Sequence, residues 1–187
     1  MTTASIQVRP ARTDELPAIH ELLTAAFGTV EAPRIIQIVD EALADPSAQP
    51  LVSLVAVHDG RMVGHVLFTH AEVGTGAESV AASLLAPLAV HPDVQGQDIG
   101  GRLIAAGLTG LEGAGVGLAF VLGHPGYYPR AGFEPAGALG FIAPYPIPAE
   151  HADAWMVHVL KPELQGPSVA GPVRCAPAFA HPELWSE

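Results

Sequence analysis

The sequence is poor in cysteine and in basic side chains, and each shortage excludes a class of protein. Cys175 is the only cysteine, so the chain cannot form an internal disulfide, and the reducing cytoplasm is the expected compartment. Lysine and arginine total 8 against 19 aspartates and glutamates, which gives a formal net charge of -11. A nucleic-acid backbone needs a basic face, so we expect no nucleic-acid partner.

Long apolar runs are also lacking. The first residues, MTTASIQVRPARTDEL, contain no apolar core of the length found in signal peptides. Elsewhere Gly, Pro or charged residues interrupt each apolar stretch before it reaches the roughly 20 residues that span a bilayer. We therefore expect no association with a membrane.

The chain does have enough apolar sequence for one packed domain. Its 187 residues are 49% hydrophobic and 14% charged, which favours a folded core over disorder. No internal repeat marks a second domain. We expect a single domain over residues 1–187, in which residues 166–187 form an extended, proline-rich tail packed on the body.

Hydrophobic periodicity divides the chain into helical and extended segments. Alternation predicts a first strand over 5–11, and helical spacing predicts helices over about 13–28 and 33–43, with Gly28 ending the first. Residues 51–70 contain two strands joined by Asp59-Gly60, a strong hairpin signal. Further strands are predicted over 83–90, 117–123 and 154–160, and a last one is open over 168–174.

Residues 83–123 form a predicted strand–loop–helix–strand unit with a glycine-rich loop. Such a unit pairs two parallel strands and places the loop at the open carboxyl edge of the sheet. In HPDVQGQDIGGRL, Gly96, Gly100 and Gly101 remove Cβ atoms that would keep an anion from backbone amides and from the helix N-terminus. The Walker lysine and the Rossmann GxGxxG spacing are absent, so a merely tight turn is the alternative interpretation.

Asp98 places a carboxylate in the middle of this anion loop. Asp tolerates the left-handed backbone that such a position favours, and its side chain is placed to cap the following helix. Arg102 follows closely and is placed to offset the charge. The opposing expectation is that Asp98 repels an anion and weakens its binding.

The stretch LAPLAVHPDVQGQDIGGRL, followed by YYPRAGF, resembles the GCN5-related N-acetyltransferase (GNAT) family. The loop pattern of that family is Gln/Arg-x-x-Gly-x-Gly/Ala. Gln95 matches its first position and Gly100 its last, whereas Asp98 replaces the central glycine. The order of elements is similar over about residues 6–160, and the likeness is sharpest over 84–135. GHPGYYPRAGFEP and VRCAPAF are most similar to a bacterial subgroup of predicted N-acetyltransferases.

The resemblance implies an α/β fold with a mixed, mostly antiparallel central sheet and helices on both faces. Its parallel strand–loop–helix–strand unit would splay at Pro87 into a V-shaped cleft for acetyl-CoA, the implied co-substrate. The pantetheine arm would pair with one strand and the pyrophosphate would rest on the loop amides. The implied cofactor residues are Leu88, Ala89, Val90, Gln95, Gly96, Gln97, Asp98, Ile99, Gly100 and Gly101. An amide near Leu88 would polarise the thioester carbonyl.

Tyr128 is the catalytic residue that the resemblance implies. It lies five residues before Phe133, in the register of the family's tyrosine acid. A phenol, with a pKa of about 10, can return a proton to the departing CoA thiolate. Tyr127 is the fallback, and packing against the core or the cofactor is the alternative for both tyrosines. Pro129 departs from the commonest family pattern.

No spacing selects a general base for the acceptor amine. The candidates are His91, His124, Glu21, Glu72 and Glu78, and a water-mediated relay needs none of them. The 9 histidines include no His-x-x-x-His pair, so no metal site is expected.

The acceptor itself is not named by the sequence. In the family, a segment such as residues 137–155 often borders the acceptor pocket, so Phe141, Tyr145 and Trp155 are candidate walls, with hydrophobic cover for the sheet as the alternative. The acidity mildly favours a cationic acceptor. The family is often dimeric, which leaves a homodimer open.

These features together predict an acyl-CoA-dependent N-acetyltransferase, in which a neutral primary amine attacks the acetyl-CoA thioester directly. The alternative is a non-catalytic acyl-CoA-binding or sensing module that kept the loop and lost turnover. A third hypothesis is a structural or interaction protein without a CoA site, which failure to bind CoA would favour.

Overall fold

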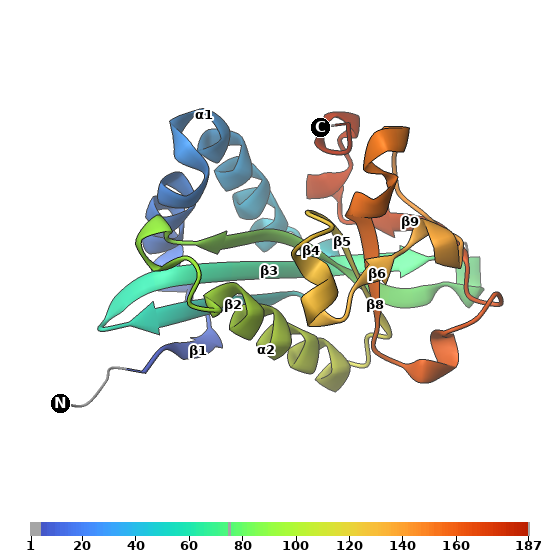
Figure 1. Cartoon of the computed structure of the whole chain (residues 1–187), viewed down its shortest axis with the longest axis horizontal. Helices are drawn as coiled ribbons and strands as arrows, with labels where there is room; N and C mark the ends of the chain where they lie inside the picture. The colour runs from blue at the N-terminus through green and yellow to red at the C-terminus, as the bar shows by residue number, and fades with distance from the viewer. Residues whose placement is uncertain (1–4, 75, 187) are drawn as a thin grey trace.

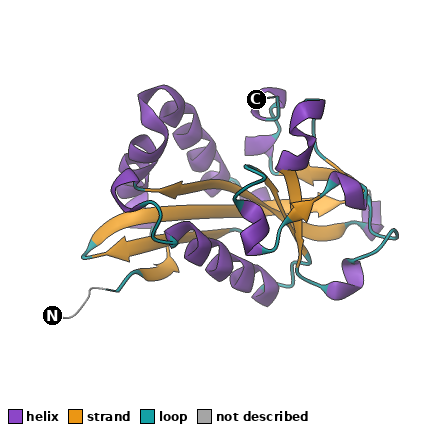
Figure 2. Ribbon diagram, viewed as in Figure 1, coloured by secondary structure: helices purple, strands orange, loops and turns teal. Residues whose placement is uncertain are grey.

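The computed structural model describes residues 5–74 and 76–186. Within these ranges nine strands form one sheet in the order β1-β2-β3-β4-β5-β8-β6, with β9 beside β3 and β7 (Figures 1 and 2). The strands are β1 Gln7–Pro10, β2 Val52–His58, β3 Arg61–Val73, β4 Val80–Val90, β5 Leu118–Leu122, β6 Glu134–Pro135, β7 Phe141–Ile142, β8 Trp155–Val159 and β9 Gly171–Cys175. Two long helices, α1 Leu16–Ala44 and α2 Ile99–Gly113, accompany them.

Most strand pairs are antiparallel. The β2–β3 hairpin turns on Asp59 and Gly60, whose φ angles are 50° and 73°, as the Asp-Gly pair predicts. The β4–β5 pair is parallel, from Ala82 beside Leu118 to Leu84 beside Phe120, and so is the short β7–β9 pair. The predicted mixed, mostly antiparallel sheet is therefore confirmed.

Helix α1 covers one side of the sheet, which we call the α1 face (Figure 1). Gly28, with φ 78° and ψ 170°, breaks the helix where its end was predicted, but the second part begins directly after it and includes Pro33. Residues 13–44 are long and apolar enough to cross a membrane, contrary to our expectation from the sequence. Ile19, Leu23 and Val39 are buried in the core, and 22% of the apolar window is buried in the structure.

Helix α2 covers the opposite side, the α2 face (Figure 1). The predicted apolar stripe, including Leu103, Ile104 and Leu111, is buried against the sheet. Gly107 lets the helix approach closely, because a β-carbon at this position would clash with the ring of Phe68. Helices on both faces are thus confirmed.

The sheet divides between β4 and β5. Leu85 pairs with Phe68 of β3 and Leu88 pairs with Val66, so β4 carries a bulge at Ala86 and Pro87, as the proline predicts. The parallel pairing of β4 with β5 ends just before this bulge, at Leu84. We call the region beyond it, where the two strands no longer pair, the β4–β5 split.

The predicted tail is part of the sheet and of the core. Its strand β9 pairs with β3, with Val173 opposite Val73, in the segment left open as a last strand. Two short 3₁₀ turns follow, Pro177–Phe179 and Pro182–Leu184, on the same side of the sheet as α1 (Figure 1). Phe179 and Trp185 are buried in the core of the α1 face.

Candidate functional site

The loop before α2 presents a row of open amides. Asp98 has φ 59° and ψ 22°, the left-handed conformation predicted for it, and Gly96 has φ 79°. The amide of Arg102 donates to the Asp98 carbonyl at 3.1 Å and so makes the first bond of the helix. Within the described residues, the amides from Gly96 to Gly101 have no protein acceptor. Together with the helix dipole, these amides can hold an anion.

A cavity of about 420 Å³ opens over this loop. Its lining includes the predicted residues Leu88, Val90, Gln95, Gly96, Asp98, Ile99 and Gly100, whereas Ala89, Gln97 and Gly101 are not among the residues that line it. Tyr127 and Arg130 also line it, although the sequence did not assign them to this site. We refer to residues 95–101 with this cavity as the loop cradle.

The Asp98 carboxylate does not behave as predicted. It makes no capping hydrogen bond to α2 and, among the described residues, no ion pair with Arg102. The Asp98 carboxylate instead lies close to Gly101. A β-carbon added at Gly101 would clash with Asp98 Oδ1. The cradle therefore keeps an uncapped negative charge, and Arg130 is the basic side chain that shares its cavity.

Tyr127 and Arg130 form one stacked unit beside the cradle. The Arg130 guanidinium carbon lies 4.2 Å from the Tyr127 ring centroid, and its Nε donates to the Tyr127 carbonyl at 3.1 Å. The Tyr127 hydroxyl lies against the α-carbon of Gly100, where a β-carbon would clash. Burial raises the pKa of Tyr127 and the charge of Arg130 opposes that rise. Because Gly100 has no β-carbon, the Tyr127 hydroxyl can lie in the cradle.

The free edge of β4 exposes the backbone of alternate residues. The His91 amide donates to Val63 of β3 at 2.8 Å, so the Ala89 amide and carbonyl also point to β3 and pair with His65. The backbone groups of Leu88 and Val90 then point away from β3, toward the β4–β5 split. Gln95 Nε2 donates to the Val90 carbonyl at 3.2 Å on that side. Ala89 therefore differs from its neighbours, because its backbone is already paired.

Tyr128 lies across the split from Leu88. It begins the 3₁₀ turn Tyr128–Ala131, and both residues line a second cavity together with Gly123, His124, Gly126 and Tyr127. The Tyr128 ring packs edge-on between Tyr127, at 5.1 Å, and Phe133, at 5.7 Å. Burial raises the pKa of Tyr128 far above that of a free phenol. The hydroxyl is therefore protonated at neutral pH, as a general acid requires.

The candidate bases occupy different regions. His91 accepts a hydrogen bond from Arg61 at 2.7 Å, and Glu72 is bonded to Arg174 at 2.7 Å. Glu21 is exposed on α1 and Glu78 is exposed in the turn between β3 and β4. Of the five candidates, His124 is the one that lines a cavity with Tyr128, and its Nδ1 accepts from the Gly126 amide at 3.3 Å.

The aromatic residues predicted to wall an acceptor pocket mostly pack in the core. The Trp155 ring stacks on Phe120 at 5.0 Å, and Phe141 meets the same ring edge-on at 5.2 Å. Both are buried in the core, but Trp155 also lines a cavity with Tyr145 within residues 137–155, and Phe141 lines another, so both interpretations hold in part. Tyr145 is partly buried, 6.5 Å from the Trp185 ring.

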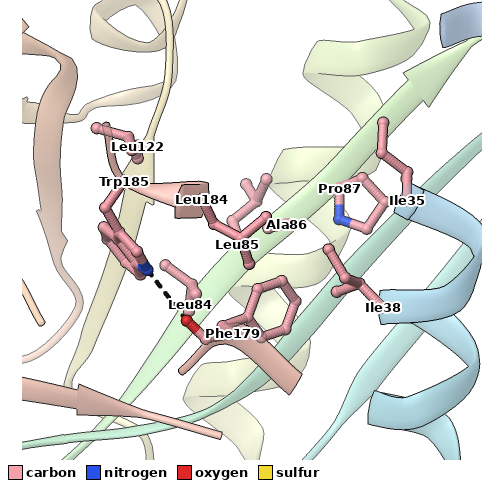
Figure 3. A pocket seen from close by; sticks show the side chains of 10 residues that line it. All are labelled: Ile35, Ile38, Leu84, Leu85, Ala86, Pro87, Leu122, Phe179, Leu184 and Trp185. Carbon is pink, nitrogen blue, oxygen red and sulfur yellow. Dashed lines mark hydrogen bonds between the residues drawn. The ribbon is translucent and has the colours of Figure 1, made fainter. Parts of the chain in front are cut away.

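A third cavity, on the α1 face, is lined by apolar residues of α1, β4, β5 and the C-terminal turns (Figure 3). Phe179 and Trp185 are its aromatic walls. The sequence analysis missed both, and the one available signal was their apolar character in an otherwise polar, proline-rich tail.

No metal centre accompanies these cavities in residues 5–74 and 76–186. Within these ranges no group of three or more His, Cys, Asp or Glu side chains is arranged to hold a metal ion. The polar groups at the split include backbone amides, the two phenols and His124.

The chain is similar in sequence to a family of acetyltransferases. The family model described as Acetyltransferase (GNAT) domain matches residues 7–136. The uncharacterised N-acetyltransferase YjhQ of Escherichia coli K12 is 47% identical over 160 residues, which cover 84% of this chain and 85% of YjhQ.

Two solved structures extend the likeness. The GNAT family N-acetyltransferase YhbS from Escherichia coli, in complex with CoA, has a TM-score of 0.83 at 26% identity, over 97% of this chain and 95% of YhbS. A GNAT acetyltransferase from Brucella melitensis, in complex with acetyl-CoA, has a TM-score of 0.72 at 29% identity, over 94% of this chain and 99% of its own. The chain belongs to the GNAT family of N-acetyltransferases.

Proposed function

We propose that the protein transfers an acetyl group from acetyl-CoA to a primary amine by direct attack on the thioester. The observation that carries this proposal is the convergence, at one split in the sheet, of the loop cradle, the outward amide of Leu88 and the protonated phenol of Tyr128. The CoA and acetyl-CoA complexes of the two solved relatives support it.

The cradle and the split have the groups that acetyl-CoA needs. The amides from Gly96 to Gly101 would hold the pyrophosphate, with Arg130 beside them as a cation. The outward groups of Leu88 and Val90 would pair with the pantetheine arm as a neighbouring strand does. The Leu88 amide would then donate to the thioester carbonyl and stabilise the oxyanion that forms there.

Proton movements complete the proposed reaction. The neutral amine nitrogen forms a bond to the carbonyl carbon, and the carbon–sulfur bond breaks. The CoA thiolate takes the Tyr128 proton, and the proton lost by the attacking nitrogen leaves to water through the cavity side that carries exposed His124. A proton from water then restores the Tyr128 phenol. We also propose a cytoplasmic location, because Cys175 is the one cysteine and the chain cannot form an internal disulfide.

Calorimetric titration with acetyl-CoA tests the first half of this proposal. Gly100→Ala would push the Tyr127 hydroxyl and narrow the cradle, so acetyl-CoA should bind about tenfold more weakly. Gly113→Ala is the matched control, because a β-carbon there meets nothing within 4 Å at the other end of the same helix. Equal affinities for the two variants would place the acetyl-CoA phosphates elsewhere.

Release of free CoA thiol in the presence of a panel of amines tests the second half. Amine-dependent release supports acetyl transfer. Tight binding of acetyl-CoA without release by any amine would instead favour the alternative, a binding or sensing module.

A further inference from the structure

The apolar cavity on the α1 face lies directly beside the β4–β5 split. We call it the chamber; its walls include Ile35 and Ile38 of α1, Pro87 of β4, Leu122 of β5, and Phe179 and Trp185 (Figure 3). Its β4 wall ends at Pro87, and the next residue, Leu88, lines the cavity shared with Tyr128. The chamber and that cavity thus flank the same point of the split from opposite faces of the sheet.

This placement gives the chamber a role in the reaction. With acetyl-CoA in the cradle on the α2 face, the thioester carbon would lie in the split. An amine that attacks this carbon must carry its substituent away from the cofactor. The chamber lies on that side of the bulge at Pro87.

The lining of the chamber has no charged group. All of its side chains are apolar, and its one polar side-chain atom, Trp185 Nε1, already donates to the Phe179 carbonyl at 3.0 Å (Figure 3). Transferring an ammonium ion into such surroundings without a carboxylate costs several kcal/mol or more, about what forces a buried group to neutralise. A substituent that enters the chamber must therefore be uncharged, and the nitrogen at the split must be neutral because only the neutral form can attack a thioester.

The size of the chamber suits a small substituent. Its volume is about 170 Å³, and an apolar protein cavity of roughly 150 Å³ is known to hold one benzene molecule. One aromatic ring or a branched aliphatic group of similar bulk fits. A long polyamine does not match either the volume or the polarity.

Charged and histidine side chains of α1 take part in two close pairs. Arg34 of α1 and Glu183 of the C-terminal turn form an ion pair at 2.7 Å, and Arg34 lowers the pKa of Glu183. His20 and Asp40, both on α1, lie 2.7 Å apart. The Arg34–Glu183 pair joins α1 to the turn next to Leu184 and Trp185.

We propose that the chamber binds the acceptor and selects amines that carry one apolar, ring-sized group and are neutral when bound. This inference rests on the proposed acetyl transfer and names its acceptor class. The net charge of -11 mildly favours a cationic acceptor. The proposal differs from that expectation, because no acidic side chain lines the chamber.

Binding of para-ethylaniline, an apolar amine that is neutral at neutral pH, tests the chamber without any turnover. Tryptophan fluorescence should report saturable binding, and Trp185→Phe should identify Trp185 as the source of the signal. Ile35→Glu places a carboxylate in the wall and should weaken binding by about tenfold or more. Val30→Glu is the control, because Val30 lies on the same helix and is 91% exposed.

Turnover separates this inference from the function on which it rests. Thiol release should be faster with para-ethylaniline than with spermidine, and only Ile35→Glu should slow it, while both variants bind acetyl-CoA as the wild type does. If acetyl-CoA is neither bound nor consumed, the proposed function fails, and the fluorescence titration still decides the chamber.

Three results would overturn the inference. One is acetylation of spermidine at least as fast as that of para-ethylaniline. Another is equal para-ethylaniline binding by the Ile35→Glu and Val30→Glu variants. The third is weaker binding of hexanoyl-CoA, but not of para-ethylaniline, by Ile35→Glu, which would make the chamber a site for longer acyl chains.

Discussion

Tyr128 carries the sharpest prediction at the scale of single residues. Its phenol is mostly buried and protonated, and it lines a cavity with Leu88 across the split. Tyr128→Phe removes the acid and keeps the ring that packs on Phe133. We expect kcat to fall by about 100-fold, because general acid catalysis contributes that order of rate. The Kd of acetyl-CoA should stay unchanged in calorimetry.

Tyr127→Phe is the natural control, because the two tyrosines are adjacent and differ in what their hydroxyls approach. The Tyr127 hydroxyl lies at Gly100 in the cradle, so its loss should change the Kd of acetyl-CoA more than kcat. A large loss of kcat in Tyr127→Phe, with little in Tyr128→Phe, would exchange the roles of the two residues.

His65 gives the protein a predictable sensitivity to acid. It is fully buried on β3, its Nε2 lies 3.0 Å from Ser53 Oγ, and burial lowers its pKa to about 4. In the unfolded chain a histidine has a pKa of about 6.5, so between these values the unfolded state binds more protons. Stability should therefore fall as the pH drops from about 6.5 to about 4, by up to about 3 kcal/mol.

Urea unfolding across this pH range measures the effect. His65→Gln can keep the contact with Ser53 but cannot take up a proton, so its stability should change less with pH. His181→Gln, at an exposed site, should retain the wild-type slope. If His65→Gln and the wild type show the same slope, another group is responsible for it.

At the scale of elements, the join between the loop and α2 has one feature that works against its proposed ligand. Asp98 adopts the left-handed backbone that the turn needs, but its carboxylate is uncapped beside the open amides. Asp98→Asn should keep this backbone, because Asn also tolerates it, and should remove the charge. We expect acetyl-CoA to bind roughly fivefold more tightly, with the gain reduced at high salt.

Asp98→Ala separates charge from conformation, since alanine removes the charge but disfavours the left-handed backbone by about 1 kcal/mol. Its Kd for acetyl-CoA, from calorimetry, should exceed that of Asp98→Asn. Weaker binding by Asp98→Asn than by the wild type would show that the carboxylate assists the cofactor.

Elements with a local chemical signal were predicted well. Asp59-Gly60 fixes the hairpin, Gly28 interrupts α1, and Pro87 marks the bulge, because each depends on backbone preferences of one or two residues. The stripe that includes Leu103 follows from helical period alone.

Features that depend on pairing or on distant contacts were not predictable in this way. The direction of the Ala89 backbone is set by the register with His65, which sequence does not report. Trp155 packs on Phe120 because two strands meet. The strand register and the contacts between strands are known only once the sheet has formed.

At the scale of the whole molecule, the two ends of the chain build one side of the site. Arg34 and Glu183 are 149 positions apart and form an ion pair where α1 meets the C-terminal turns. Exposed pairs of this kind contribute about 0–1 kcal/mol, so burial of Phe179 and Trp185 must supply most of the attachment. The α1 face is thus completed by the last residues, whereas the cradle on the α2 face is built without them.

This division predicts how the protein unfolds. Trp185 is 3% exposed and packs 5.6 Å from Trp155, so Trp185→Ala should remove about 3–5 kcal/mol from the free energy of unfolding. Because both rings belong to the common core, calorimetry should show one transition at a lower Tm, and Ser186→Ala, at an exposed neighbour, should leave Tm unchanged. Well below that Tm, the Kd of acetyl-CoA should match the wild type, since the cradle lies on the other face. A separate early transition in Trp185→Ala, with the main Tm unmoved, would make residues 166–187 an appendage, because a segment inside a single cooperative domain cannot melt alone.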